Sequence, residues 1–347
     1  MTDIEIRIEG HAGHITLQRP DALNALTYDM ALAIEAALDT WRDDDQVTSV
    51  IIDAEGDKAF CAGGDIVDIY KTASAGDFSH ARQFWTDEYR LNAKIFEYPK
   101  PYLAFMQGFT MGGGVGISCH GSHRIVGESS QIAMPECGIG LVPDVGGSLL
   151  LALAPGRLGE YLGTTTTRMK TDDAIFAGFA DHFVPEEHWP ALKADLVAGL
   201  GADAAVAKVS QSPETGTLRA LQPEIDAHFG GETLADIVRA LKHSDSDFAK
   251  DALKKLSRVS PLGAACAVEL IHRARTVDSI RKALELEYRC TYRAVDDGDF
   301  VEGIRALVID KDKSPQWKHD SAESVPDIDV ARMLMPLGDN ILSFAER

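Results

Sequence analysis

Residues 107–114 read Gln107-Gly-Phe-Thr-Met-Gly-Gly-Gly114 and begin directly after Tyr102–Met106, a short apolar run that predicts a buried strand. Glycine at 112–114 permits unusual backbone angles and lets another group approach the main chain closely. The triplet also opens a predicted short helix that runs to Cys119. Because the first N–H groups of a helix have no partners within it, this stretch indicates a site built from backbone donors.

A second glycine pair follows another predicted buried strand, Ser49–Asp53. The sequence Phe60-Cys-Ala-Gly-Gly-Asp65 contains Gly63 and Gly64. If N–H groups from both clusters converged on one point, they would form an oxyanion hole, which stabilises charge on a carbonyl oxygen. Either cluster taken alone is better explained as a tight turn, and neither matches a glycine-rich nucleotide motif.

The pattern of elements predicts an α/β fold with a layered, largely parallel sheet, because strand-like and helix-like segments alternate. Expected strands lie near 4–8, 14–18, 49–53, 102–106, 123–126, 131–133 and 179–184. Beyond about residue 202 the strand signals end, and the chain reads as helical and highly charged to about 306. From about 314 it is polar and proline-containing, which predicts an extended surface segment.

Composition excludes several classes of function. The 347 residues carry a net charge of -20, which argues against binding nucleic acid or an anionic membrane through a general basic surface. The longest apolar run is far too short to cross a bilayer, and the acidic N-terminus is unlike a targeting peptide, so we expect a cytoplasmic protein. Five scattered cysteines and unpaired histidines predict no disulfide framework and no metal site.

Two carboxylates stand out because each lies in an apolar loop. Glu136 follows Met134-Pro135, and Asp144 follows Pro143 and precedes Val145-Gly-Gly147. A buried carboxylate is costly unless it is partnered or used, so both are candidate functional groups. A capping or salt-bridge role is an equally good explanation for each when it is considered alone.

Together, these segments resemble the crotonase superfamily, the enoyl-CoA hydratase/isomerase fold. Five motifs occur in the family's order: Ile15–Pro20 with Leu23–Leu26, Phe60–Asp65, Gln107–Gly114, Met134–Glu136 with Gly138–Gly147, and Ala177–Asp181. The resemblance implies a (ββα)n spiral core over residues 1–205 that binds acyl-CoA, and an oxyanion hole from the N–H groups of Gly64 and Gly113. It also implies that coenzyme A lies along 23–26 and 62–65, where Arg19 and Lys58 are candidates for local positive charge.

One departure selects a branch of this superfamily. Hydratases carry a glutamate two residues beyond the glycine triplet, and this chain has Gly116 there. The sequence looks like the 3-hydroxyisobutyryl-CoA hydrolase branch, in which Glu136, Asp144 and a substrate-contacting glutamate at Glu88 are all expected. Segments of the C-terminal third also resemble that branch: Ser260-Pro261, Glu287-Tyr-Arg289 and Asp299–Asp312.

The resemblance implies hydrolysis of a 3-hydroxyacyl-CoA thioester, in valine catabolism. Glu136 would act as nucleophile or general base, and Asp144 would hold the substrate hydroxyl or assist water. Coenzyme A is then part of the substrate and no separate cofactor is expected. An enoyl-CoA hydratase or isomerase and a non-catalytic acyl-CoA-binding subunit remain alternatives. Residues 206–347 are expected to cover the active site, to mediate assembly into a homo-oligomer, or both.

Overall fold

The computed structural model describes residues 3–345. The chain groups into two compact units, each made of three separate segments. Unit 1 comprises Met1–Asp65, Arg90–Ala133 and Arg168–Arg219, and unit 2 comprises Ile66–Tyr89, Met134–Thr167 and Ala220–Arg347. The sequence predicts catalysis for residues 1–205 and covering of the active site or assembly for residues 206–347. The two units do not test that assignment, which stays a prediction.

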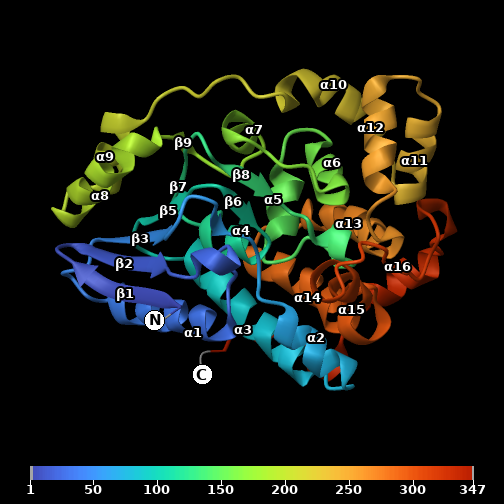
Figure 1. The fold of residues 1–347 in the computed structure, drawn as a ribbon, viewed down its shortest axis with the longest axis horizontal. Helices are drawn as coiled ribbons and strands as arrows, with labels where there is room; N and C mark the ends of the chain where they lie inside the picture. Colours follow the sequence, from blue (N-terminus) through green and yellow to red (C-terminus); the bar gives the residue numbers. More distant parts are fainter. Residues whose placement is uncertain (1–2, 346–347) are drawn as a thin grey trace. The chain divides into compact units, whose positions relative to one another are not determined.

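Unit 1 contains two sheets whose strands alternate along the sequence (Figure 1). The six-stranded sheet has the order β1 (Ile4–Glu9), β2 (Ala12–Leu17), β3 (Ser49–Ala54), β5 (Tyr102–Met106), β7 (His123–Val126) and β9 (His182–Phe183). The three-stranded sheet has the order β4 (Ala59–Cys61), β6 (Phe109–Met111) and β8 (Gln131–Ala133). Every pairing is parallel except β1 with β2. Three successive strand pairs therefore give one strand to each sheet, as a repeating ββα core requires.

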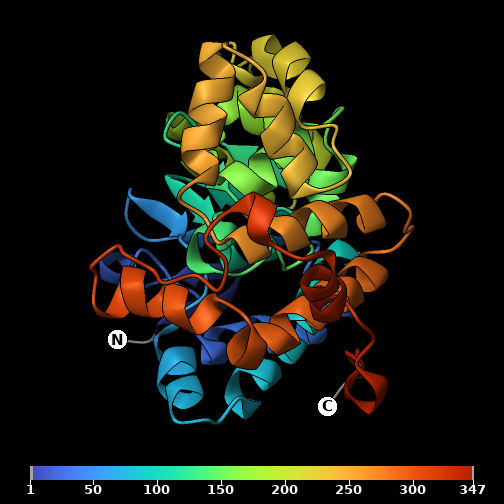
Figure 2. The same cartoon turned by 90° about the vertical axis from the view of Figure 1, so that its right-hand side faces the viewer.

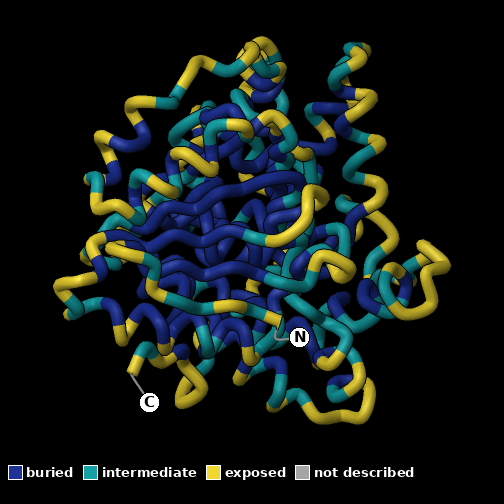
Figure 3. The backbone as a smooth tube through the Cα atoms, turned by 60° about the vertical axis from the view of Figure 1, so that its left-hand side comes forward, coloured by how far each residue is buried: buried dark blue, intermediate teal, exposed yellow. Residues whose placement is uncertain are grey.

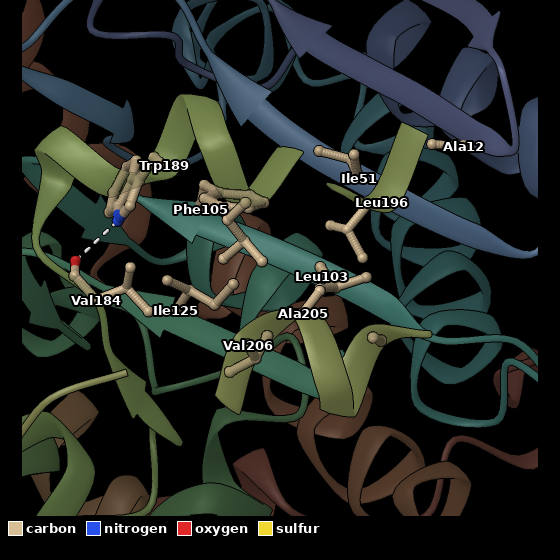
Figure 4. Packing of buried hydrophobic residues seen from close by; sticks show 12 residues of the cluster. Ala12, Ile51, Leu103, Phe105, Ile125, Val184, Trp189, Leu196, Ala205 and Val206 are labelled. Carbon is tan, nitrogen blue, oxygen red and sulfur yellow. Dashed lines mark hydrogen bonds between the residues drawn. The ribbon is translucent and has the colours of Figure 1, made fainter. Parts of the chain in front are cut away.

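Helices of unit 1 pack on the strands. The core cluster combines side chains of the six-stranded sheet with those of α8 (Trp189–Val197) and α9 (Ala202–Val209), as Figure 4 shows. On β2, Ala12 belongs to this cluster, whereas a Cβ at the next residue, Gly13, would meet the ring of Trp41 on α1 (Tyr28–Arg42). Because side chains alternate along a strand, the strand's two sides meet different helices. Strands β2, β4 and β5 are buried along their whole length, whereas β1 is only partly buried; buried residues are drawn dark blue in Figure 3.

Unit 2 contains only helices and loops among its described residues. Its helices are α2 (Val67–Ser74), α5 (Gly147–Leu153), α6 (Leu158–Thr165), α11 (Leu234–Lys242), α12 (Asp247–Leu256), α13 (Pro261–Ala274), α14 (Ile280–Asp297), α15 (Phe300–Ile304) and α16 (Asp327–Met333), with most of α10 (Leu218–His228). Helix α13 is buried along most of its length and packs on α5 and α6. The amphipathic helices α11 and α12 lie side by side, orange in Figure 2.

Two of the described helices cross the boundaries between the units, one of them α10 at Arg219 and Ala220. Helix α3 (Ser79–Phe96) runs from unit 2 into unit 1 at Tyr89 and Arg90. Unit 1 also includes α4 (Gly113–Ser118) and α7 (Thr171–Phe176). None of the helices that the described chain forms is long and apolar enough to span a membrane.

Three local expectations need correction. Strands β4 and β6, which lie just before the two glycine clusters, are absent from the strands expected from the sequence. With three residues each, they are too short to show the alternation of apolar and polar residues that indicates a strand. The strand expected over 179–184 is confined to His182–Phe183, because Ala177 to Ala180 are used in the bonds that end α7. The C-terminal segment contains α16 after Pro326, where proline and two aspartates suit a helix start.

Candidate functional site

The two glycine clusters follow neighbouring strands of the three-stranded sheet. Strand β4 pairs in parallel with β6, so both strands end at the same edge. Gly64 lies three residues beyond β4, and Gly113 is the first residue of α4, two residues beyond β6. A Cβ at Gly63 would lie 3.6 Å from the Met111 carbonyl oxygen, so the two turns are adjacent.

Glycine is required at this edge for two different reasons. Gly112 has φ +49° and ψ −118°, a conformation closed to residues with a Cβ. At Gly114 a Cβ would lie 2.2 Å from the Cys61 carbonyl oxygen, so only glycine lets α4 pack on β4. The sequence needs both glycines to set α4 against the sheet with its N-terminus beside the turn after β4.

The N–H groups of Gly64 and Gly113 donate to no acceptor among residues 3–345. The Leu26 N–H donates to Gly63 O at 2.8 Å, and Leu26 O accepts from Asp65 N at 2.8 Å. These two bonds pass on either side of Gly64, so the Gly64 N–H stays unused. Gly113 is in the first helical turn, where N–H groups carry positive partial charge. Unused donors on two adjacent turns are suited to bind an anionic or polarised oxygen.

Arg19 connects the two loops expected to contact coenzyme A. Its guanidinium lies 3.0 Å from Asp65 Oδ2 and donates to Ala25 O at 2.6 Å. Asn24 accepts from Arg19 N at 2.8 Å and stands in the left-handed region at φ +53°. The charge of Arg19 is therefore shared with Asp65 and serves to hold the loop at 23–26, while Lys58 is exposed at the surface.

In unit 2 the structure brings together Glu88, Glu136 and Asp144, the three carboxylates singled out in the sequence, with a fourth, Glu287. All four are buried, and the most exposed side chains among them reach only 4%. They come from different elements: Glu88 from α3, Glu136 from the 3₁₀ helix Glu136–Ile139, Asp144 from the turn before α5, and Glu287 from α14. Sequence-distant segments thus converge on one acidic cluster.

Hydrogen bonds fix part of this cluster and leave part of it unused. The Tyr89 hydroxyl donates to Asp144 Oδ2 at 2.7 Å and lies 3.3 Å from Thr291 Oγ1. Glu287 accepts from the backbone N–H groups of Gly146 and Ser148 at 2.8 and 3.0 Å. By contrast, Glu88 Oε1 and Glu136 Oε2 have no hydrogen-bond partner among the described residues. Buried polar atoms are nearly always paired, so these two oxygens are candidates for contact with a ligand.

The electrostatics of the cluster favour the protonated forms. Burial raises the pKa of Asp144 to about 7 and that of Glu287 to about 8. Burial raises the pKa of Glu88 and of Glu136 well above the usual range, and the charge of Asp144 is the second cause. Acids whose pKa values lie near neutrality can both take up and release protons at physiological pH. Asp144 can therefore take up and release a proton near neutral pH, while burial and the charge of Asp144 keep Glu136 protonated to a higher pH than an exposed glutamate.

Tyr89 and Glu287 are the site neighbours that the sequence did not single out for this role. A signal for Glu287 existed, because it falls on the buried stripe of α14 with Ala283, Leu284 and Thr291, where an acidic residue is unexpected. Tyr89 follows Glu88 directly and had no signal of its own. No group of three or more His, Cys, Asp or Glu side chains in the described part of the chain is placed to hold a metal ion.

Comparison with known proteins agrees with this architecture. Residues 12–334 match the family model described as enoyl-CoA hydratase/isomerase. A crystal structure of an enoyl-CoA hydratase from Rhodobacter sphaeroides 2.4.1 is 53% identical, with a TM-score of 0.95, and the match covers 99% of this chain and 100% of that one. A carnitinyl-CoA dehydratase from Mycobacterium thermoresistibile is 39% identical, with a TM-score of 0.95 and full coverage of both chains. The predicted crotonase fold is confirmed.

Curated relatives carry a different name. The 3-hydroxyisobutyryl-CoA hydrolase, mitochondrial, of Gallus gallus is 37% identical, with 98% of this chain and 90% of the relative covered. The protein of the same name from Homo sapiens is 36% identical, with 99% and 91% covered. Their names place those proteins in mitochondria, so the cytoplasmic location expected from the N-terminus stays a prediction. On the family model and these matches together, the chain belongs to the enoyl-CoA hydratase/isomerase family.

Proposed function

We propose that this protein hydrolyses the thioester bond of a 3-hydroxyacyl-CoA, with 3-hydroxyisobutyryl-CoA the first substrate to test. The observation that carries the proposal is the buried pair Glu136 and Asp144, both with raised pKa, combined with glycine at 116. The curated relatives named 3-hydroxyisobutyryl-CoA hydrolase support the same reaction. The products are the free hydroxy acid and coenzyme A, which enters as part of the substrate.

The proposal assigns the thioester carbonyl oxygen to the N–H groups of Gly64 and Gly113. Their unused donors support this role, since a carbonyl oxygen gains negative charge as its carbon becomes tetrahedral. Removing one such donor in other enzymes lowers kcat by about 10²–10³. Because side-chain substitution cannot delete a backbone N–H, this assignment is tested by changing the acyl-CoA substrate and not the protein.

Glu136 has two chemically complete routes. As a nucleophile, its carboxylate attacks the carbonyl carbon, coenzyme A leaves as the thiolate and takes a proton, and water then hydrolyses the mixed anhydride. As a general base, it takes a proton from water, whose oxygen attacks the carbonyl while the proton passes to the leaving thiolate. The unpaired Oε2 suits either route, and both routes need the ionised form of Glu136, whose population rises with pH because its pKa is raised.

Asp144 and Glu88 are assigned to the rest of the acyl group. Asp144 accepts a hydrogen bond from the substrate hydroxyl or orients the attacking water. Its carboxyl group is held by the hydrogen bond from Tyr89. Glu88 contacts the substrate through its unpaired Oε1. A buried polar site of this kind rejects an acyl group that lacks the matching hydroxyl, because its own groups would remain unpaired.

The test is thiol release across a panel of acyl-CoAs with and without a 3-hydroxyl group. Glu136→Gln is expected to abolish turnover nearly completely while acyl-CoA binding, measured by calorimetry, changes little. Full turnover in that variant would contradict the assignment. Rapid acid quench and mass spectrometry then separate the routes: an acylated Glu136 peptide supports the nucleophile, and simultaneous appearance of thiol and acid without it supports the base.

Hydration of an enoyl-CoA is the second candidate, because the 53% identical structure is described as an enoyl-CoA hydratase. Hydratases of this superfamily need two glutamates, and Gly116 stands where the first would be. Its N–H only completes the turn of α4, donating to Gly112 O at 3.1 Å. Loss of the conjugated double bond of a crotonyl-type substrate would favour hydration. Binding without release of coenzyme A from any acyl-CoA would favour a non-catalytic subunit.

A further inference from the structure

The turn that carries Asp144 is unusual in its backbone. Gly147 N donates to Asp144 O at 2.6 Å, and the two residues between them, Val145 and Gly146, have φ +52° and +80°. Two successive positive φ values with this bond define a type I′ turn. Glycine adopts that conformation freely, but a β-branched residue such as valine is strained there. Such strain persists only where the surroundings enforce it.

Glu287 is placed to enforce it. Its Oε2 accepts from Gly146 N at 2.8 Å, inside the turn, and its Oε1 accepts from Ser148 N at 3.0 Å, just beyond it. The Ser148 hydroxyl donates to Oε1 as well. One carboxylate thus receives donors on both sides of Gly147. Both backbone N–H groups belong to residues at the start of α5, where such groups lack helical partners.

Packing alone does not explain a glutamate at this position. The side chain is 0% exposed, and no ion pair to Glu287 is formed within the described residues. Burial therefore opposes its ionised form, and the nearby Asp144 charge adds to this effect. A residue retained against that cost is expected to do something that an apolar residue of similar size cannot do.

We propose that Glu287 is a positioning residue that holds the strained turn at 144–147 and thereby fixes the Asp144 carboxyl group. The proposal rests on the proposed function for the role of Asp144. Tyr89 holds the far end of the same side chain through Oδ2. Asp144 is then fixed at two points: its backbone by Glu287 and its carboxylate by Tyr89.

Glu287→Gln tests this at nearly constant volume. An amide has a single acceptor oxygen, so one of the two backbone N–H groups loses its acceptor and faces an N–H donor instead. The turn should shift, and misplacement of a catalytic group by about 1 Å lowers the rate by about 10²-fold. The expected result is kcat for thiol release reduced by roughly 10- to 100-fold with KM changed by less than about threefold.

Val145→Gly supplies the second arm of the experiment. Glycine adopts the positive φ without strain, so the turn should depend less on Glu287. The loss in kcat caused by Glu287→Gln should therefore be at least about tenfold smaller in the Val145→Gly background than in the wild-type background. Glu160→Gln is the matched control, a buried glutamate of unit 2 paired with Arg275 at 2.6 Å; it should lower the thermal midpoint without lowering kcat per folded molecule.

The outcomes separate this proposal from the proposed function. Wild-type kcat in Glu287→Gln, or a loss that Val145→Gly does not relieve, would overturn the positioning role. Failure of the wild-type protein to release coenzyme A from any substrate would instead overturn the proposed function. The coupling would then be measured in thermal midpoints, where the decrease caused by Glu287→Gln should be smaller in the Val145→Gly background; equal decreases would refute the turn-holding role by themselves.

Discussion

Replacing Asp144 with asparagine is expected to stabilise the fold at alkaline pH, although it removes a carboxyl group from the candidate site. The side chain is 4% exposed, and burial raises its pKa from 3.8 to about 7. Below pH 3.8 the group is protonated in both the folded and unfolded states, so its ionisation costs no stability. As the pH rises to about 7, the unfolded chain releases a proton that the folded chain retains, and stability falls.

The pKa difference sets the size of this effect. About three pKa units correspond to an upper limit of ~4 kcal/mol in the free energy of unfolding, present in full only above about pH 7. Asparagine removes that cost, but it brings two N–H donors into a buried site, and each needs an acceptor. We therefore expect a gain of about 2 kcal/mol near pH 8.5 that disappears near pH 4.

Urea unfolding across this pH range measures the gain directly. Asp245→Asn, a change at an exposed aspartate between α11 and α12, is the control and should change the free energy of unfolding by no more than about 0.5 kcal/mol. The reasoning would be refuted if Asp144→Asn were no more stable than the wild type near pH 8.5, or if its advantage were the same at every pH. Thiol release by Asp144→Asn should fall in the same preparations, which would show that the carboxylate is retained for function at a cost in stability.

Two further predictions concern individual contacts. Tyr89→Phe removes the 2.7 Å hydrogen bond that favours ionised Asp144, so the pKa of Asp144 should rise. The acid limb of the kcat–pH profile should then move up by about 1–2 pH units. An unchanged acid limb would show that Asp144 does not control it. Gly114→Ala would place a Cβ 2.2 Å from the Cys61 carbonyl oxygen, so it should destabilise unit 1 by about 3 kcal/mol or more. Differential scanning calorimetry checks this, and a thermal midpoint within error of the wild type would contradict the close packing of α4 on β4.

Much of the fold could be predicted because its signals are local. Apolar runs such as Tyr102–Met106 and the glycines at 112–114 each report a strand or a turn without knowledge of the remaining chain. The short strands β4 and β6 could not be predicted in this way. Three residues show no period, and only pairing with neighbours far along the chain makes them strands.

The candidate site shows the same limit. Glu136 and Asp144 could be singled out because prolines and glycines place them in apolar loops. Their partners could not, because the bond from Tyr89 to Asp144 joins α3 to a loop, and the bonds from Gly146 and Ser148 to Glu287 join that loop to α14. Raised pKa values depend on such convergence, because desolvation is a property of the folded surroundings and not of the sequence around one residue.

The interleaving of the two units has a consequence for synthesis of the chain. The last segment of unit 1 ends at Arg219, so a growing chain contains every residue of both sheets while the segment 220–347 is still to be made. Unit 2 cannot be completed until that segment arrives, because α5 and α6 pack on α13 and α2 packs on α15. A premature stop between 220 and 286 would keep every strand residue yet remove Glu287, and with it the acceptor for the N–H groups of Gly146 and Ser148. Ribosome-bound intermediates of this length are therefore where chaperone dependence should be greatest.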